Sequence, residues 1–127
     1  MAQQKRMTRS DKKDGVVVVS FAVTHVGIDT ERQLGQELRE YIKDENPPQM
    51  LIDLSGVSYV SSGPLGILTA MDRDISQQGG VLKFCSVTAY VLETFRAAGL
   101  LRLFDVHGNC EEALASFNQT PGSTVAG

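Results

Sequence analysis

A serine-rich segment in the middle of the chain has the residues best suited to chemistry. Residues 55–66 read SGVSYVSSGPLG and bring the hydroxyls of Ser58, Ser61 and Ser62 close together in the chain. An apolar run precedes the segment, and loops that leave such strands in open α/β sheets commonly bind ligands. We expect Ser62 or Gly63 at the N-cap of a helix, where free N–H groups and the helix dipole favour an anion. A phosphoserine is one group that such a position would stabilise.

The same segment also has a purely structural interpretation. Ser61 and Ser62 suit an N-cap, and Gly63 with Pro64 can shape a tight entry into a helix. Neither a GxxxxGK[ST] nor a GxGxxG spacing is present, which excludes a phosphate-cradling loop that hydrolyses nucleotides. A hydrolase built on Ser62 would need a base, but the sequence has no GxSxG elbow and its histidines are remote. We therefore expect a binding protein and not an enzyme.

The other reactive side chains favour structural roles. His25 and His107 are the only histidines, and neither has a cysteine or carboxylate at a metal-ligand interval. Cys85 and Cys110 are far apart and lack a CxxC spacing, so we expect two reduced, packed thiols. Asp53 ends an apolar run, and we expect it to accept hydrogen bonds from N–H groups of the following loop. No metal or other cofactor is expected.

Composition is that of an ordinary globular domain. The chain has 127 residues, of which 42% are hydrophobic and 21% charged. Its formal net charge of -3 is too small to indicate a polyanionic partner, so nucleic acid binding is not expected. No stretch approaches the roughly 20 apolar residues of a membrane span, and residues 1–14 lack the apolar centre of a signal peptide. These features predict a cytoplasmic protein without a membrane partner.

Strands and helices are predicted to alternate along the chain. Residues 16–23 contain four consecutive valines, typical of a strand covered on both faces. Shorter apolar runs at 50–54, 81–86 and 103–106 predict three more strands. The four predicted helices begin near Thr30, Pro64, Thr88 and Asn109. This alternation predicts an α/β fold with a mostly parallel mixed sheet of four to five strands and four helices packed on it.

Helix-end signals support these boundaries. Thr30 with Gln33 has the spacing of a capping box, and Asn109 with Glu112 has the reciprocal N-cap spacing. Gly99 is suited to the left-handed position that ends a helix.

A single domain is expected over residues 15–117. Residues 1–14 are polar with clustered charge, and residues 118–127 are rich in small and polar residues. Both flanks are therefore expected to be flexible.

The order of these elements and three blocks of sequence resemble the STAS domain, a family named for sulphate transporters and anti-sigma factor antagonists. The blocks are LIDLSGVSYVSSG at 51–63, GGVLKFC at 79–85 and VLETFRAAGLLRLFD at 91–105. The resemblance covers most of the folded unit and implies a STAS-type α/β fold.

The resemblance also implies a function in transcription. In bacterial members of the family, the domain binds an anti-sigma factor and frees a sigma factor, until an anti-sigma kinase phosphorylates one serine or threonine. The implied partners are an anti-sigma serine/threonine kinase and, in addition, a phosphatase. A phosphate adds about -1.5 to -2 charges to a packed interface, which weakens binding unless nearby cations neutralise this charge. The implied contact residues are Ser58, Tyr59, Ser61, Ser62, Gly63, Pro64 and Gly66.

The family's acceptor motif fits this chain in two ways. It usually reads Asp-Ser-Ser/Thr-Gly-Leu-Gly with the second hydroxyl residue as acceptor, whereas residues 61–66 read SSGPLG. Alignment on Ser-Ser-Gly makes Ser62 the acceptor and Pro64 an insertion. Alignment without a gap places Gly63 at the acceptor position, which predicts a scaffold or a module that binds its partner constitutively.

Further alternatives remain open from the sequence. Ser61, Ser58 and Thr69 are lesser candidates for phosphorylation. Binding of a small molecule or nucleotide in the strand-end crevice is a third functional hypothesis, since such crevices can hold ligands.

Overall fold

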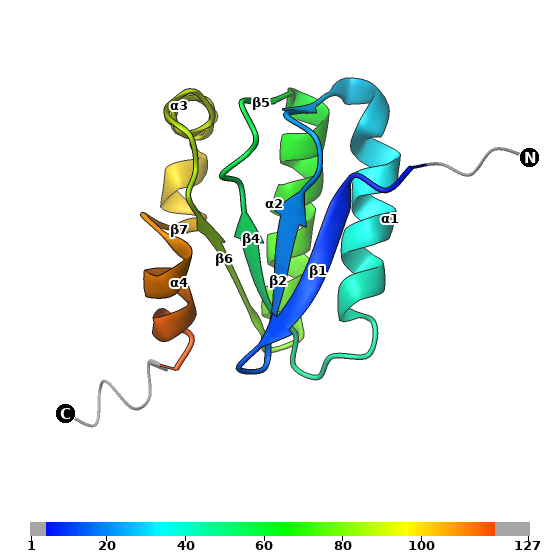
Figure 1. Cartoon of the computed structure of the whole chain (residues 1–127), viewed down its shortest axis with the longest axis vertical. Coiled ribbons are helices and arrows are strands. Elements are labelled where there is room, and N and C mark those ends of the chain that lie inside the picture. Colours follow the sequence, from blue (N-terminus) through cyan, green and yellow to red (C-terminus); the bar gives the residue numbers. More distant parts are fainter. Residues whose placement is uncertain (1–4, 119–127) are drawn as a thin grey trace, which may run out of the picture.

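The four valines predicted to form a covered strand begin β2 (Val16–Phe21), the second strand of a five-stranded sheet. The computed structural model describes residues 5–118 and orders the sheet β1-β2-β4-β6-β7 (Figure 1). β2 is parallel to β4 (Gln49–Asp53), which is followed by β6 (Val81–Cys85) and β7 (Asp105–His107), also parallel. The predicted α/β fold with a mostly parallel mixed sheet is confirmed.

The edge strand β1 (Thr8–Lys13) lies in a part of the chain that was expected to be flexible. It pairs antiparallel with β2, from Thr8 opposite Phe21 to Lys13 opposite Val16, so the flexible segment does not extend to residue 14. Asp14 and Gly15 form the turn, with φ of 53° and 81°. Asp-Gly is a strong hairpin signal, and charged side chains are typical of sheet edges. The remaining expectation of flexibility falls on residues 1–4 and 119–127, which lie outside the described residues.

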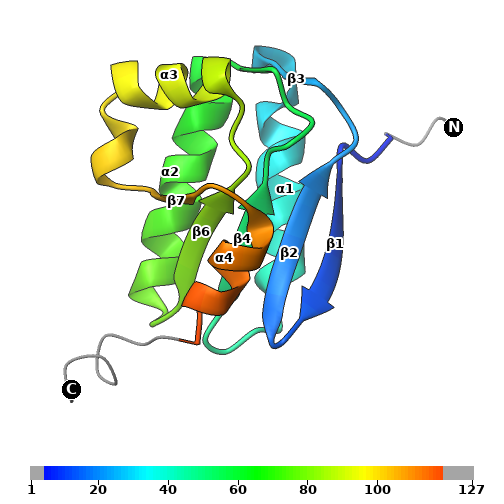
Figure 2. The same cartoon turned by 60° about the vertical axis from the view of Figure 1, so that its left-hand side comes forward.

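Four helices pack on this sheet, as predicted. They are α1 (Glu31–Ile42), α2 (Ser62–Gln77), α3 (Ala89–Ala97) and α4 (Cys110–Ser116), and short 3-10 turns lie at Ile28–Thr30 and Leu100–Arg102. Figure 2 shows α4 in front of the sheet and α1 and α2 behind it. None of the helices within residues 5–118 is long and apolar enough to cross a membrane.

Side chains of the central strands point alternately to the two faces of the sheet and contribute to an apolar cluster on each face. Met50 and Ile52 belong to the large core under α1 and α2, whereas Leu51 packs with Ala113 of α4 on the opposite face. Successive strand side chains point to opposite faces, so a strand covered on both sides is apolar throughout.

Two of the predicted helix ends are confirmed and one is wrong. The Asn109 side chain accepts a hydrogen bond from the Glu112 N–H at 2.9 Å, and Gly99 has the left-handed φ of 76°. Thr30 is at the N-cap position of α1, but its side chain makes no capping hydrogen bond, and its hydroxyl donates to the Gly27 carbonyl at 2.6 Å.

A buried carboxylate fastens β1 to α1. Glu37 is 5% exposed and accepts hydrogen bonds from the N–H groups of Met7 (3.1 Å) and Thr8 (3.0 Å) and from the Gln33 amide (2.7 Å). The Thr8 hydroxyl donates to the same carboxylate. Burial acts to raise the pKa of Glu37, but hydrogen bonds from Thr8, Gln33 and Met7 outweigh it and hold the pKa below its ordinary value. The predicted capping box does not form, because the Thr30 N–H donates to the Gly27 carbonyl at 3.1 Å and the Gln33 side chain turns to Glu37.

The prediction of two reduced thiols is wrong. Cys85 at the end of β6 and Cys110 at the start of α4 form a disulfide, with their Cα atoms 5.2 Å apart. The two residues are 25 positions apart in sequence, but α4 folds back onto the sheet directly after β7 and returns to β6. Sequence spacing alone does not reveal that contact.

Candidate protein-binding site

A second, two-stranded sheet holds the serine-rich segment near the carboxyl ends of the central strands. β3 (His25–Val26) pairs in parallel with β5 (Tyr59–Val60). The Ser61 N–H donates to the Val26 carbonyl at 2.9 Å, and the Ser58 N–H donates to the Thr24 carbonyl at 2.8 Å. The segment is therefore fixed by backbone hydrogen bonds up to the first turn of α2.

The N-cap of α2 is Ser61 and not Ser62 or Gly63, so the helix begins before Pro64. Ser61 is the N-cap, with extended backbone (φ -84°, ψ 173°), and its carbonyl accepts the Leu65 N–H at 3.1 Å. Pro64 fits within this first turn because a helix needs no N–H from its opening residues. Pro64 is buried, so it shapes the entry into α2 and does not present a contact surface.

The two adjacent serines differ in accessibility. The Ser61 hydroxyl oxygen is buried and has no hydrogen-bond partner among the described residues, and Ser61 as a whole is half-buried. Ser62 is the first residue of α2 and is exposed. Of the two, only Ser62 presents its side chain to an incoming protein. The lesser candidate Thr69 is half-buried, and its hydroxyl donates to the Leu65 carbonyl at 2.9 Å.

Gly63 lies beneath an acidic side chain from α1. A Cβ atom at Gly63 would be 1.7 Å from Oε2 of Glu31 and 2.9 Å from its Cδ. The Glu31 carboxylate therefore fills the space that a side chain at residue 63 would take. Sequence reasoning missed this contact because Glu31 and Gly63 meet only through the packing of α1 against α2.

An aromatic strip extends the site beyond the predicted residues; it consists of His25, Tyr59 and Tyr90. The rings of His25 and Tyr59 are 5.8 Å apart, and Tyr59 stacks on Tyr90 at 6.3 Å. Tyr90 is 61% exposed, and Ile28, in the turn after β3, is 71% exposed. Exposed aromatic residues of this kind are enriched in protein interfaces.

A hydrogen bond connects the start of α3 to the serine-rich segment. Thr88, the N-cap of α3, donates through its hydroxyl to the Val57 carbonyl at 2.8 Å. This contact holds the start of α3, and with it Tyr90, beside Tyr59. The strip thus combines β3, β5 and α3, which are separated in sequence.

The arrangement around the serines differs from that of a hydrolase. His25 is nearer to the segment than the sequence suggests, but its Nδ1 lies 3.1 Å from the Thr24 hydroxyl, and no hydrogen bond within residues 5–118 joins it to Ser61 or Ser62. His107 uses one nitrogen, Nε2, toward both Asp105 (2.9 Å) and Ser116 (3.4 Å). A Ser-His-Asp relay needs both ring nitrogens.

Two further expectations concern Asp53 and a small-molecule site in the serine-rich segment. Asp53 accepts the Ser55 N–H at 2.9 Å, as predicted. Three surface hollows of about 290 to 330 Å³ occur among the described residues, and none of these three is lined by residues 55–66. They therefore give no support to a small-molecule site in the serine-rich segment.

The sequence matches known proteins over most of its length. The STAS domain family matches residues 9–113. BtrV of Bordetella bronchiseptica, which carries the name of a putative anti-sigma factor antagonist, is 29% identical over 107 residues, covering 84% of this chain and 90% of BtrV.

Solved structures share the same architecture. An anti-sigma-factor antagonist (STAS) domain protein from Planctomyces limnophilus has a TM-score of 0.79 at 22% identity, covering 87% of this chain and 97% of that one. An anti-sigma factor antagonist from Mycobacterium paratuberculosis has a TM-score of 0.77 at 25% identity, covering 87% and 92%. At 22% identity, the Planctomyces limnophilus structure shows a shared fold only. The Mycobacterium paratuberculosis structure has the same fold.

Proposed function

Because this chain belongs to the STAS domain family, we propose that it binds an anti-sigma factor of the serine/threonine kinase type and that phosphorylation of Ser62 releases this partner. Binding frees a sigma factor in the cytoplasm, and phosphorylation returns the system to its repressed state. A phosphatase that removes the phosphate completes the switch. The function proposed is binding of a protein partner and not catalysis.

The observation that carries the proposal is the exposure of Ser62 at the first residue of α2, beside the exposed Tyr59. A kinase can reach this hydroxyl, and we infer that a partner docked on the aromatic strip at Tyr59 also covers Ser62, which follows three residues later in the chain. The other proposed contacts around it are Ser58, which is exposed, the half-buried Ser61 and Gly63, and the exposed Gly66.

Electrostatics explains why one phosphate would be sufficient. The free N–H groups at the start of α2 favour an anion, and Ser62 is exposed, so a phosphate on it would stay in water in the free protein although the Glu31 carboxylate lies against the neighbouring Gly63. In the complex, the same phosphate would have to be desolvated within a contact formed by aromatic and small residues. The desolvation penalty applies only to the complex, so the affinity for the anti-sigma factor falls.

The test is phosphorylation followed by binding. The purified chain is incubated with ATP and the anti-sigma-type kinases of its source organism, and phosphate is mapped by mass spectrometry. We expect one phosphate on Ser62 and a loss of affinity of at least tenfold, equivalent to about 1.4 kcal/mol. Ser62→Ala should bind normally and resist release by ATP.

Ser76→Ala is the matched control, because Ser76 is an exposed serine near the other end of the same helix. It should behave as the unmodified chain. Binding that persists after stoichiometric phosphorylation of Ser62 would refute the switch. Failure of the chain to bind any anti-sigma factor would refute the function itself.

A second candidate function is constitutive binding without a phosphate switch. The specific observation in its favour is that α2 runs regularly from Ser62 to Gln77 with Pro64 inside its first turn, as an alignment without insertion requires. Gly63 then fills the acceptor position and carries no hydroxyl. Stable binding with no phosphate after kinase treatment would select this alternative.

A further inference from the structure

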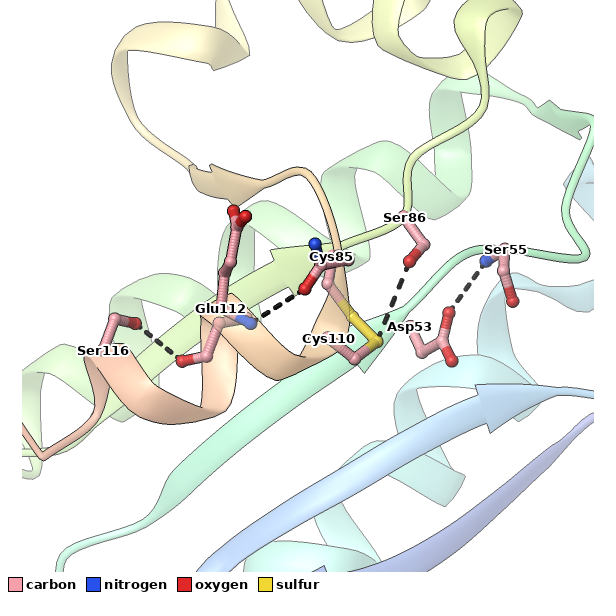
Figure 3. Close-up of a disulfide and its surroundings, with 9 residues drawn as sticks. Asp53, Ser55, Cys85, Ser86, Cys110, Glu112 and Ser116 are labelled. Carbon is pink, nitrogen blue, oxygen red and sulfur yellow. Dashed lines mark hydrogen bonds between the residues drawn. A yellow bond between two sulfur atoms is a disulfide. The ribbon is translucent and has the colours of Figure 1, made fainter.

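The disulfide between Cys85 and Cys110 lies outside the proposed binding site (Figure 3). It packs against the smaller apolar cluster with Leu51 and Ala113, and polar groups lie on its other side. The Ser86 hydroxyl is 3.8 Å from Cys110 Sγ, and a carboxylate oxygen of Asp53 lies within 4.8 Å of both sulfur atoms. Asp53 is paired with Cys85 in the register of β4 and β6.

We propose that Cys85 and Cys110 are a redox-modification site, a reversible dithiol–disulfide couple that controls how firmly α4 and the start of α3 are held. Disulfides within the cytoplasm, where we place this protein, are usually redox-active and not permanent. The disulfide itself is given by the cysteine geometry, whereas its reversibility in the cytoplasm and its effect on partner binding rest on the proposed function.

The two thiols differ in exposure to solvent, and this difference sets the order in which they react. Cys85 is fully buried, whereas Cys110 is half-buried. A hydroperoxide therefore oxidises Cys110 first: the thiol sulfur takes up one peroxide oxygen to give a sulfenic acid, and the other oxygen leaves as water or an alcohol. The Cys85 thiol then attacks the sulfenic sulfur, and its proton departs with the hydroxyl as water. Two thiols become one disulfide, and the peroxide is reduced by two electrons.

The disulfide encloses the segment that carries Tyr90. α3 and β7 lie between the two cysteines in the chain. Cys85 is followed by Ser86, whose φ of 57° is unusual for a residue with a side chain and stores backbone strain. Two residues later, Thr88 makes the hydrogen bond to Val57 of the serine-rich segment. Opening the disulfide would release Ser86 from this conformation and loosen the contact that positions Tyr90.

The first experiment measures the couple directly on the complete chain. The protein is equilibrated in glutathione buffers from fully reduced to fully oxidised and quenched with N-ethylmaleimide in denaturant, so that the buried Cys85 is also accessible, and intact mass counts the labels. We expect two labels in the most reducing buffer and none in the most oxidising one. Buffers between these should hold both forms, in proportions that change with the glutathione ratio. No labels in any mixture would mean a permanent crosslink, and two labels in all of them would mean that no bond forms. Either result overturns the proposal.

The second experiment asks whether the couple controls structure. Hydrogen exchange compares the reduced and oxidised forms, and we expect amides of residues 86–90 and 108–117 to exchange roughly tenfold faster in the reduced form. Cys110→Ser should exchange at the fast rate in every buffer. Equal exchange in both forms of the unmodified chain would overturn the control of α3 and α4, and this comparison does not depend on the variant.

Partner binding is measured in the same buffers. A lower affinity of the reduced form for the anti-sigma factor links the couple to the proposed function, and equal affinity overturns that link. Absence of binding in both forms would count against the proposed function, while the labelling and exchange results would still decide whether the redox couple exists.

Discussion

The Glu31 carboxylate, at the start of α1, lies against Gly63 at the start of α2. Oε2 of Glu31 is 1.7 Å from where a Cβ of residue 63 would be, so glycine is the residue that fits while Glu31 keeps this position. The obstacle is the end of a flexible side chain and not backbone. A larger residue at position 63 is therefore accommodated when Glu31 rotates away.

The first prediction follows from this contact. Gly63→Ala should lower the free energy of unfolding by about 1 kcal/mol relative to Gly66→Ala, since Ala must displace Glu31 at position 63 but meets open space at position 66. Adding Glu31→Ala to Gly63→Ala should remove this difference, giving a coupling energy of about 1 kcal/mol in urea unfolding. Additive effects of the two substitutions would show that the carboxylate does not occupy this space.

The second prediction concerns the hydrogen bonds between the Glu37 carboxylate and the start of β1. Glu37→Ala leaves the buried N–H groups of Met7 and Thr8 without their acceptor, so the free energy of unfolding should fall by about 2 to 3 kcal/mol. Glu40→Ala is the matched control: Glu40 is on the same helix and forms an exposed ion pair with Arg6, worth less than about 1 kcal/mol. Chemical unfolding of both variants measures the difference, and equal losses would contradict the role of Glu37.

The same carboxylate should make stability depend on pH. The folded pKa of Glu37 is held below its ordinary value of 4.5, so the unfolded chain takes up the proton more readily. The stability due to ionised Glu37 is therefore fully present above about pH 4.5 and is lost as the pH falls through the folded pKa. Unfolding curves recorded from neutral to acidic pH should show this loss in the unmodified chain and a smaller one in Glu37→Gln. An identical pH profile would rule out this linkage.

The main sheet was largely predictable because its strands have an unambiguous pattern. The four valines of β2 and the run from Met50 in β4 are apolar on both faces, as buried parallel strands must be. The edge strand β1 was missed because only one of its six residues is buried, so it has no apolar pattern. The serine-rich segment was recognisable from its hydroxyls and its place after β4. Its contacts with Glu31 and Tyr90 were not, because they depend on how separate helices pack.

The third prediction tests the aromatic strip. Tyr90→Ala should weaken binding of the anti-sigma factor roughly tenfold or more, because exposed tyrosines in such positions often contribute strongly to interfaces. The fold should be unaffected, since Tyr90 is 61% exposed. Val81→Ala is the control: Val81 is 38% exposed but begins β6, at the amino end of the parallel strands, whereas the strip lies near their carboxyl ends. Isothermal titration of both variants gives the comparison, and equal affinities would exclude the strip from the interface.

The fourth prediction concerns the contribution of the disulfide to stability. The crosslink joins residues 25 positions apart, and closing a loop of this length restricts the unfolded chain by about 3 kcal/mol. Reduction should therefore lower the free energy of unfolding by a similar amount in urea titrations with and without a phosphine reductant. The double variant Cys85→Ser/Cys110→Ser should have the lower stability and show no response to reductant. If the unmodified chain unfolds at the same urea concentration in both conditions, the disulfide does not stabilise the fold, and the α4 contact with the sheet must rest on packing of Ala113 and its neighbours alone.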